Sequence, residues 1–294
     1  MTKTAFIAIV GRPNVGKSTL LNTICGEKIA IVSNKPQTTR NRITGILTKG
    51  DNQYVFLDTP GMHKPRTALG DFMVKTANGS IGESDVILLV VEPVPSVGDI
   101  EKGIIERAKL TKTPCILVVN KVDEHTPVAI AETISAYSSE YEFDAVVPLS
   151  AKSGKGIEAL FEEVDKFVYD SVWYFPEDAI TDQPERQIAA EIIREKILRT
   201  LNKEIPHGTA VVIEEFKEDK KIIRIRAEIF CEKNSHKGII VGKNGAALKL
   251  VGTYARQDLE AFFGMQVYLN LWVKVKENWR DSAATVGNFG YRDE

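Results

Sequence analysis

A loop of eight residues near the start of the chain requires a defined strand and helix around it. Gly11–Ser18 reads Gly-Arg-Pro-Asn-Val-Gly-Lys-Ser and fits the pattern G-x-x-x-x-G-K-[ST] in full. It directly follows the apolar run Phe6–Val10, and helical spacing starts near Lys17. Glycines in this pattern let successive backbone N–H groups converge on phosphate oxygens, and the start of the helix adds its positive dipole end. The sequence therefore predicts a strand, a phosphate-binding loop and a helix.

The first 170 residues alternate short apolar runs with stretches of helical spacing. Strands are expected for the compact runs rich in Val and Ile, at 6–10, 54–57, 86–91, 115–119 and 145–148. Helices are expected around 17–25, 69–80, 99–110, 127–138 and 156–168. This alternation predicts an α/β domain over 1–170, with a mostly parallel sheet and helices on both faces. Ligands bind such sheets at the carboxyl ends of the strands.

Several side chains at these strand ends are expected to meet the phosphates and Mg²⁺. Lys17 can reach the β- and γ-phosphates, and Ser18 can give its hydroxyl to the metal. Asp58-Thr-Pro-Gly61 follows another expected strand. A carboxylate there can hold Mg²⁺ through its water shell, and the Gly61 N–H can point at the γ-phosphate. An isolated Asp-x-x-Gly is usually only a turn, but the complete phosphate loop upstream favours the metal site.

A threonine between the first helix and the next strand completes the expected metal set. Pro36-Gln-Thr-Thr-Arg40 occupies this stretch, and one of its hydroxyls could close over Mg²⁺ and the γ-phosphate when GTP is present. We select Thr39, with Thr38 as the neighbouring alternative, so that Ser18, Thr39 and Asp58 form the metal set. An ordinary polar loop is an equal alternative for this segment.

A motif after the fourth expected strand indicates guanine. It reads Asn120-Lys-Val-Asp123. Asp123 can accept hydrogen bonds from both the ring N–H and the amino group of guanine. Adenine lacks this donor pair and would leave the carboxylate unpaired. Asn120 is expected to brace the loop, and the stem of Lys121 to lie over the base.

A second base motif follows the fifth expected strand. It reads Ser150-Ala-Lys152, and the N–H of Ala151 can meet the guanine oxygen. Either base motif alone is a weak signal. Four motifs in this order, each at a strand end, are very unlikely to arise by chance, so the sequence predicts a GTP site.

The pattern changes near residue 170. Residues 171–186 carry scattered Pro, Trp and acidic residues without periodicity and are expected to form a linker. Beyond them a helix, two strands, a helix and a final strand are expected at 188–201, 209–216, 222–230, 245–263 and 267–275. These elements predict a small α+β domain over 187–276, which leaves 277–294 as a C-terminal tail.

A glycine-bounded loop in this second domain is a candidate RNA contact. Around it, residues 233–257 contain no acid and five basic residues, namely Lys233, Lys237, Lys243, Lys249 and Arg256. Glycines let a sugar–phosphate backbone approach, and lysines attract phosphate. A lone GxxG is more often a flexible turn, so the prediction depends on the basic surroundings. The expected RNA-binding residues are Gly242, Lys243, Asn244, Gly245, Lys237 and Lys249.

The whole chain resembles the Era family of bacterial GTPases. The matching segments of the first part are Gly11–Ser18, Gln37–Arg40, Asp58–Gly61, Asn120–Asp123 and Ser150–Lys152. Those further on are Phe175–Asp178, Thr181–Asp182, Glu191–Lys196, Gly242–Gly245 and Leu271–Lys276. The resemblance implies a P-loop GTPase domain followed by a type II KH domain. The α-β-β-α-α-β order of such a KH domain fits the expected elements if 246–263 is broken into two helices.

The resemblance also implies ligands and partners. It points to GTP and GDP with Mg²⁺, and to the 3′ end of 16S rRNA in the small (30S) ribosomal subunit, hence to a role in subunit assembly. We expect a monomer in the cytoplasm. Peripheral association with the inner face of the cell membrane rests on the resemblance alone. One alternative is a translational or metabolic GTPase whose second domain binds protein, and another is a switch at a membrane surface.

Hydrolysis is expected to differ from that of Ras-like enzymes. Met62 stands where those enzymes carry a glutamine that orients the attacking water, and a thioether cannot do so. In relatives of this class, the asparagine matching Asn14 holds a K⁺ ion whose charge replaces that of an arginine finger. The residues expected to take part in hydrolysis are Lys17, Thr39, Gly61 and Asn14.

The expected nucleotide site joins the phosphate loop and its next residue to the three later motifs. Its members are Gly11, Arg12, Pro13, Asn14, Val15, Gly16, Lys17, Ser18, Thr19, Asp58, Thr59, Pro60, Gly61, Asn120, Lys121, Asp123, Ser150, Ala151 and Lys152.

Composition argues against several other classes of protein. The formal net charge is −2, so any basic surface for a nucleic acid must be local. Cys25, Cys115 and Cys231 are far apart and show no metal-binding spacing, which indicates reduced thiols in the cytoplasm. The longest apolar run, Val86–Val91, is far shorter than a membrane span.

Overall fold

The computed structural model describes residues 1–292 except 34, 36, 63 and 202–207. It divides into two compact units. The first unit comprises Met1–Ala30, Thr39–Lys64 and Met73–Asp182. The second unit comprises Ile31–Thr38, Pro65–Phe72 and Gln183–Glu294. The expected linker 171–186 is therefore shared between the two units.

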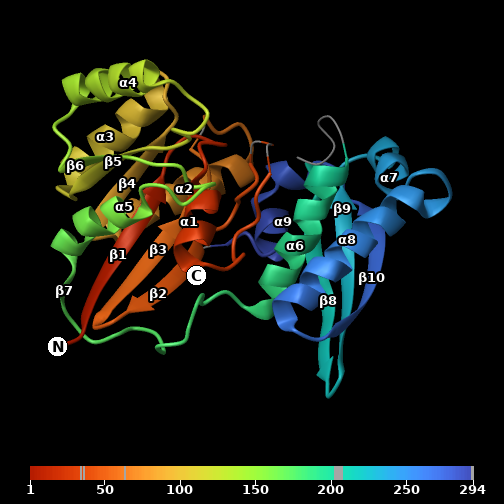
Figure 1. Cartoon of the computed structure of the whole chain (residues 1–294). Helices are drawn as coiled ribbons and strands as arrows, with labels where there is room; N and C mark the ends of the chain where they lie inside the picture. Colours follow the sequence, from red (N-terminus) through yellow and green to blue (C-terminus); the bar gives the residue numbers. More distant parts are fainter. Residues whose placement is uncertain (34, 36, 63, 202–207, 293–294) are drawn as a thin grey trace. The chain divides into compact units, whose positions relative to one another are not determined.

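A mostly parallel sheet forms the centre of the first unit (Figure 1). Its strands are β1 (Lys3–Val10), β2 (Ile43–Lys49), β3 (Asn52–Asp58), β4 (Val86–Val91), β5 (Cys115–Val119), β6 (Ala145–Pro148) and β7 (Tyr169–Asp170). The order is β2-β3-β1-β4-β5-β6, and β7 pairs with β1. β2 and β7 are antiparallel to their neighbours. Neither strand is among those expected from the sequence; β2 in particular escapes detection because Gly45 and two threonines dilute its apolar pattern.

Helices cover both faces of this sheet, as predicted. They are α1 (Lys17–Cys25), α2 (Ala68–Gly82), α3 (Asp99–Thr111), α4 (Pro127–Glu140) and α5 (Ile157–Val164), with the short 3₁₀ helix η1 (Asp165–Phe167) after α5. Along β1, Ile7 and Ile9 enter one core with Leu20 of α1. Ala8 and Val10 enter the opposite core, which contains residues of α2, α3 and α4. Burial on both faces explains why the strands read as continuous apolar runs.

The second unit is built on a three-stranded sheet (Figure 1). Its elements are α6 (Glu185–Thr200), β8 (Ala210–Asp219), β9 (Ile222–Cys231), α7 (Asn234–Val241), η3 (Lys243–Gly245), α8 (Ala246–Phe263), β10 (Gln266–Val275), η4 (Trp279–Asp281) and α9 (Ala283–Asn288). The strand order is β10-β9-β8, with β10 parallel and β8 antiparallel to β9. Ile193, Ile225 and Val251 belong to one core between this sheet and helices α6 and α8.

One expectation for this unit is wrong. The two adjacent helices of the expected order do not come from a break in 246–263, since α8 is continuous there. The additional helix is α7, which precedes the glycine loop. α7 has only eight residues and contains Gly238 and two isoleucines, which are weaker helix formers than alanine or leucine, so its sequence gives a weak helical signal. The α-β-β-α-α-β order itself is present.

The range 277–294, expected as a tail, contributes buried residues to the second unit. Trp279 is fully buried, and its Nε1 donates a hydrogen bond of 3.0 Å to the carbonyl of Gly208. Its ring centroid lies 5.3 Å from that of Phe289 and 6.1 Å from that of Tyr291. The end of the described chain is therefore part of the packed structure.

This packing predicts a stability effect. Trp279→Ala should lower the free energy of unfolding of the second unit by about 3–5 kcal/mol, because it leaves a cavity. Trp272→Ala is the matched control, because the Trp272 side chain is 58% exposed and should cost less than about 0.5 kcal/mol. Urea denaturation followed by circular dichroism measures both. Equal losses for the two variants would contradict the packing described here.

Candidate functional site

The phosphate loop is shaped by glycines that approach other backbone and side-chain atoms closely. Gly11 and Gly16 have φ angles of +148° and +99°. A Cβ at Gly11 would lie 2.3 Å from the carbonyl oxygen of Val90, and one at Gly16 would lie 2.2 Å from Nδ2 of Asn120. No side chain fits in either place, so the loop is fixed by close approach as well as by its dihedral angles.

Lys17 is held inside this loop. Its ammonium nitrogen lies 3.1 Å from the carbonyl oxygen of Gly11 and 2.8 Å from that of Arg12. Burial lowers the pKa of Lys17 to about 8, although the nearby Asp58 carboxylate acts in the opposite direction. The ammonium group is thus poorly solvated and lies where phosphate oxygens would provide strong partners.

Three oxygen-bearing side chains meet beside the loop. The hydroxyl of Ser18 lies 2.6 Å from Oδ2 of Asp58 and 2.8 Å from the hydroxyl of Thr39. The other oxygen of Asp58, Oδ1, is buried without a hydrogen-bond partner among the described residues. Burial raises the pKa of Asp58 to about 6, opposed by Lys17. Two hydroxyls and a carboxylate with an unused oxygen fit a hard divalent cation such as Mg²⁺.

The structure distinguishes the two threonine alternatives by position. The Thr38 hydroxyl donates to the carbonyl of Lys35 at 2.6 Å and lies 2.7 Å from the hydroxyl of Ser33. Thr39, and not Thr38, lies beside Ser18.

The Asp58 motif is placed against the phosphate loop. A Cβ at Gly61 would lie 2.8 Å from Pro13, and the N–H of Met62 donates to the carbonyl of Gly11 at 3.2 Å. Thr59 is buried, and its hydroxyl donates a hydrogen bond to the carbonyl oxygen of Ile9. The side chain of Met62 packs against the core that contains α3 and α4.

Asn120 joins the phosphate loop to the base motifs. Its Nδ2 donates to the carbonyl of Val15 at 2.8 Å, and its Oδ1 accepts from the N–H of Ala151 at 2.9 Å. The side chain is buried. Asp123 is exposed nearby, and a hydrogen bond with the Ser150 hydroxyl lowers its pKa. An ionised carboxylate is therefore available to a ligand.

Two lysines of the base motifs have acidic partners that sequence reasoning misses. The ammonium of Lys121 pairs with Glu92, which directly follows β4, and that of Lys152 lies 3.6 Å from Glu124. Arg12 of the phosphate loop similarly pairs with the buried Glu101 of α3. Only Glu92 carries a sequence signal, because an acid directly after a buried strand lies at the ligand-binding edge of the sheet.

The glycine loop of the second unit exposes its lysines. Gly242 and Gly245 have φ angles of +73° and +79°, and Asn244 between them has +52°. The exposed lysines are Lys237 on α7, Lys243 in the loop and Lys249 on α8. Among the described residues, none of these three lysines forms an ion pair. Their charges are free to attract an anionic backbone.

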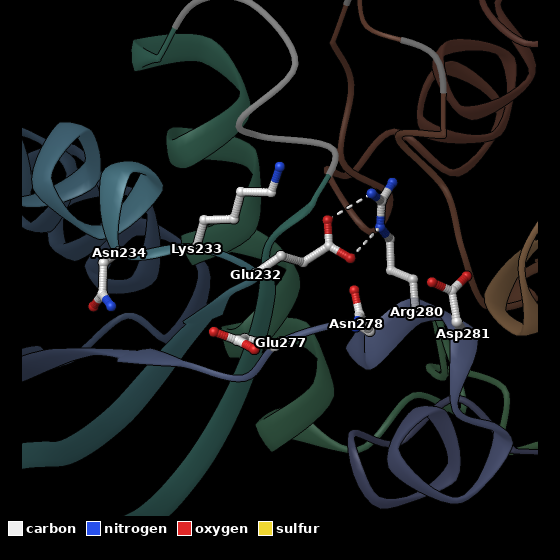
Figure 2. Close-up of a pocket in the computed structure, with 7 residues that line it drawn as sticks. All are labelled: Glu232, Lys233, Asn234, Glu277, Asn278, Arg280 and Asp281. Atoms are coloured by element: carbon white, nitrogen blue, oxygen red, sulfur yellow. Dashed lines mark hydrogen bonds and ion pairs between the residues drawn. The ribbon is translucent and has the colours of Figure 1, made fainter.

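A polar cavity of about 530 Å³ lies elsewhere in the second unit, and the sequence does not indicate it. Figure 2 shows the carboxylate of Glu232 facing the guanidinium of Arg280, with hydrogen bonds of 3.1 and 2.6 Å between them. The lining residues come from the end of β9, the start of α7 and the region of η4: Glu232, Lys233, Asn234, Glu277, Asn278, Arg280 and Asp281. None of them belongs to the expected RNA-binding set.

Comparison with known proteins covers both units. The model of the 50S ribosome-binding GTPase family matches residues 6–121, and the KH domain model matches residues 204–280. GTPase Era of Clostridioides difficile is 51% identical over 297 residues and covers 100% of both chains. GTPase Era of Clostridium kluyveri is 50% identical, over 99% of this chain and 100% of its own.

Two solved structures agree with this match. Era in complex with MgGDPNP and nucleotides 1506–1542 of 16S ribosomal RNA has a TM-score of 0.95 and 39% identity, over 99% of both chains. A single-residue variant of Aquifex aeolicus Era bound to GDP·AlF₄⁻ has a TM-score of 0.94, with the same identity and the same shares of the two chains. Among the described residues, no helix is both long and apolar enough to cross a membrane. Full-length identity above 50% and the agreement of both folds show that the chain belongs to the Era family of GTPases.

Proposed function

We propose that this GTPase is a switch of small-subunit assembly that binds GTP with Mg²⁺ in the first unit and the 3′ end of 16S rRNA in the second. The observation that carries this proposal is the presence of both sites in one chain. A formed guanine-nucleotide site and an exposed cationic glycine loop coexist. A relative that matches 99% of the chain holds a GTP analogue and this RNA together. We further propose that the protein acts in the cytoplasm.

Each phosphate-site residue has a distinct role in this proposal. Ser18, Thr39 and Asp58 would hold Mg²⁺, which supplies charge to the phosphate oxygens as the bond to the γ-phosphate breaks. Lys17 adds a second positive charge from within the loop. The backbone N–H of Gly61 orients the γ-phosphate, since the motif lies against Pro13.

Guanine is selected at the other end of the site. Asp123 accepts the ring N–H and amino group of the base, while the Ala151 backbone contacts its oxygen. Asn120 fixes the distance between base and phosphates because it bonds to both loops. An adenine base would leave the Asp123 carboxylate desolvated without donors, which disfavours ATP.

Hydrolysis requires a group other than Met62 to organise the attack, because its thioether cannot orient water and its side chain packs against the core. Asn14 is exposed in the phosphate loop and has a φ of +67°. We assign it the coordination of a K⁺ ion, whose charge would stabilise the developing negative charge.

One of the peptide bonds that join the two units lies next to the nucleotide site and can couple the nucleotide state to the second unit. Thr39 lies beside Ser18 in the first unit, while Thr38 belongs to the second unit. Arg194 of α6 donates a hydrogen bond to the carbonyl of Thr38. GTP that orders Thr39 therefore also restrains the segment before it, which belongs to the second unit. If this restraint changes the affinity for RNA, linkage requires RNA to change the affinity for GTP in return.

The role of Asn120 predicts the effect of its removal. Asn120→Ala should weaken GDP and GTP binding at least about tenfold, because the Val15 carbonyl and the Ala151 N–H lose a buried partner. Titration with a fluorescent guanine nucleotide measures this. Asn52→Ala is the matched control, since the Asn52 side chain donates to the Tyr54 hydroxyl at the far end of β3. Wild-type affinity in Asn120→Ala would contradict the bracing role.

The role of Asn14 predicts an ion dependence. Wild-type turnover should be several-fold faster in K⁺ than in Na⁺ buffer, and Asn14→Ala should turn over at the Na⁺ rate in both. Phosphate release in matched buffers measures it, with GDP affinity as the check that the loop is intact. Equal wild-type rates in the two salts would remove the K⁺ assignment.

The glycine loop predicts a separation of functions. Lys243→Glu should weaken binding of a 16S rRNA 3′-end fragment at least about tenfold by charge reversal at the phosphate contact, and leave GDP affinity unchanged. Lys3→Glu, at an exposed lysine of the first unit, is the matched control. Fluorescence anisotropy with GTP analogue and with GDP also tests the coupling. RNA affinity that is the same in both nucleotide states would refute it.

A further inference from the structure

The sheet of the second unit has a face that its core does not use. Along β9, Ile223, Ile225, Ala227 and Ile229 are buried in the core. The alternate residues point the other way, and their partners in the neighbouring strands lie on the same face. We define the open face by nine of these residues: Glu215, Lys217, Arg224, Arg226, Glu228, Tyr268, Asn270, Trp272 and Lys274.

Pairing across the strands places aromatic rings beside guanidinium groups. Tyr268 is opposite Arg224, and Trp272 is opposite Glu228, two residues along β9 from Arg226. Tyr268 and Trp272 are 55% and 58% exposed. Large rings exposed on the same face of a folded domain mark binding surfaces.

The open face is cationic although the chain is not. Its four cations, Lys217, Arg224, Arg226 and Lys274, exceed the carboxylates of this face by one, while the whole chain has a net charge of −2. The carboxylates are Glu215, Glu228 and Asp219, which is opposite Ile222, and they form ion pairs with Lys217, Lys274 and Arg224 respectively. Arg226 is exposed and forms no ion pair among the described residues. An anionic partner is therefore favoured over a neutral one.

Part of the same sheet face is already covered by the chain itself. The ring of Phe289, which follows α9, stacks on Phe230 with centroids 4.4 Å apart. Trp272 and Tyr268, further back along β10, stay exposed. The described C-terminal residues therefore do not cover the rings of Tyr268 and Trp272.

We propose that the open face is a second RNA contact, which stacks unpaired bases on Trp272 and Tyr268 and binds phosphates through Arg224 and Arg226. Aromatic rings on an open sheet with nearby arginines are a recurrent surface for single-stranded RNA. The inference rests on the RNA-binding function proposed above. A KH loop clamps about four nucleotides, whereas the fragment held by the relative, 1506–1542, has 37. The glycine loop therefore accounts for only part of that fragment, which leaves nucleotides for a second surface.

The topology lets one RNA strand reach both places. β10 is the edge strand of the sheet, and α7 and α8, which flank the glycine loop, pack on it from the core side. Its Tyr268 and Trp272 project from the opposite side. A strand that leaves the glycine loop therefore meets the open face by turning around one edge strand.

The test uses the full chain and the 37-nucleotide RNA 1506–1542. The double variant Trp272→Ala/Tyr268→Ala should bind this RNA at least about tenfold more weakly than wild type, because base stacking on each ring is lost. Trp272→Phe should keep most of the affinity, and Trp272→Leu should not. Tyr169→Ala, at an exposed ring of the first unit, is the matched control. GDP affinity and unfolding temperature should be unchanged in all four variants.

A second readout reports on stacking directly. RNA should quench part of the wild-type tryptophan fluorescence, and this part should vanish in Trp272→Phe because the remaining tryptophans lie outside the open face. Arg226→Ala should flatten the dependence of RNA affinity on salt, since one phosphate contact is lost.

The outcomes separate this inference from the function on which it rests. If wild type fails to bind the 37-nucleotide RNA, the RNA-binding function itself is wrong. If Lys243→Glu abolishes binding while the double variant binds as wild type does, only the open-face contact is wrong. If Trp272→Phe and Trp272→Leu bind the RNA with equal affinity, the contact at this position is simple apolar packing and the stacking assignment is wrong. If the double variant keeps its RNA affinity but no longer binds a protein partner of the wild type, the open face is a protein interface instead.

Discussion

One buried amide fixes the geometry of the nucleotide site. Asn120 accepts a hydrogen bond from the Ala151 N–H and donates one to the Val15 carbonyl, so the base loops and the phosphate loop share a single side chain. Gly16 has to be glycine partly because this amide occupies the space of a Cβ. The distance between guanine and phosphates is thereby set before any ligand binds, which reduces the ordering cost of binding.

The same site buries two charged groups, Lys17 and Asp58, that a magnesium nucleotide would pair. Asp58 is buried with one oxygen unpaired among the described residues, and Lys17 is buried against backbone carbonyls. A buried polar group without a partner costs about 1–3 kcal/mol. A magnesium nucleotide offers both groups opposite charge, so its binding offsets that cost and draws Thr39, already within 2.8 Å of Ser18, into the site. The two packed cores of the sheet hold the strand ends that carry these groups.

Sequence can predict what depends on local pattern. The spacing of Gly11, Gly16 and Lys17 defines a loop by itself, and the continuous apolar strands locate the ends where the other motifs must lie. Local pattern does not reveal β2, because Gly45 and two threonines interrupt its apolar residues and its place in the sheet depends on pairing with β3. α7 escapes prediction for a similar reason: Gly238 weakens its propensity, and burial of Ile240 in the core stabilises it. The pairs Lys121–Glu92 and Arg12–Glu101 join residues 29 and 89 positions apart that only the folded sheet brings together.

One of the points where the chain passes between the two units falls between Thr38 and Thr39, and this gives the proposed coupling a physical basis. On one side of that bond, Arg194 holds the carbonyl of Thr38, and Glu195 accepts a hydrogen bond of 3.0 Å from the N–H of Val32. Both α6 side chains are fully buried, and a buried charge that loses its partner is strongly destabilising. On the other side, the Thr39 hydroxyl lies 2.8 Å from that of Ser18 and belongs to the proposed metal set. Because consecutive residues cannot move independently, displacement of Thr39 after hydrolysis must either rotate the backbone at this bond or strain the buried contacts of α6.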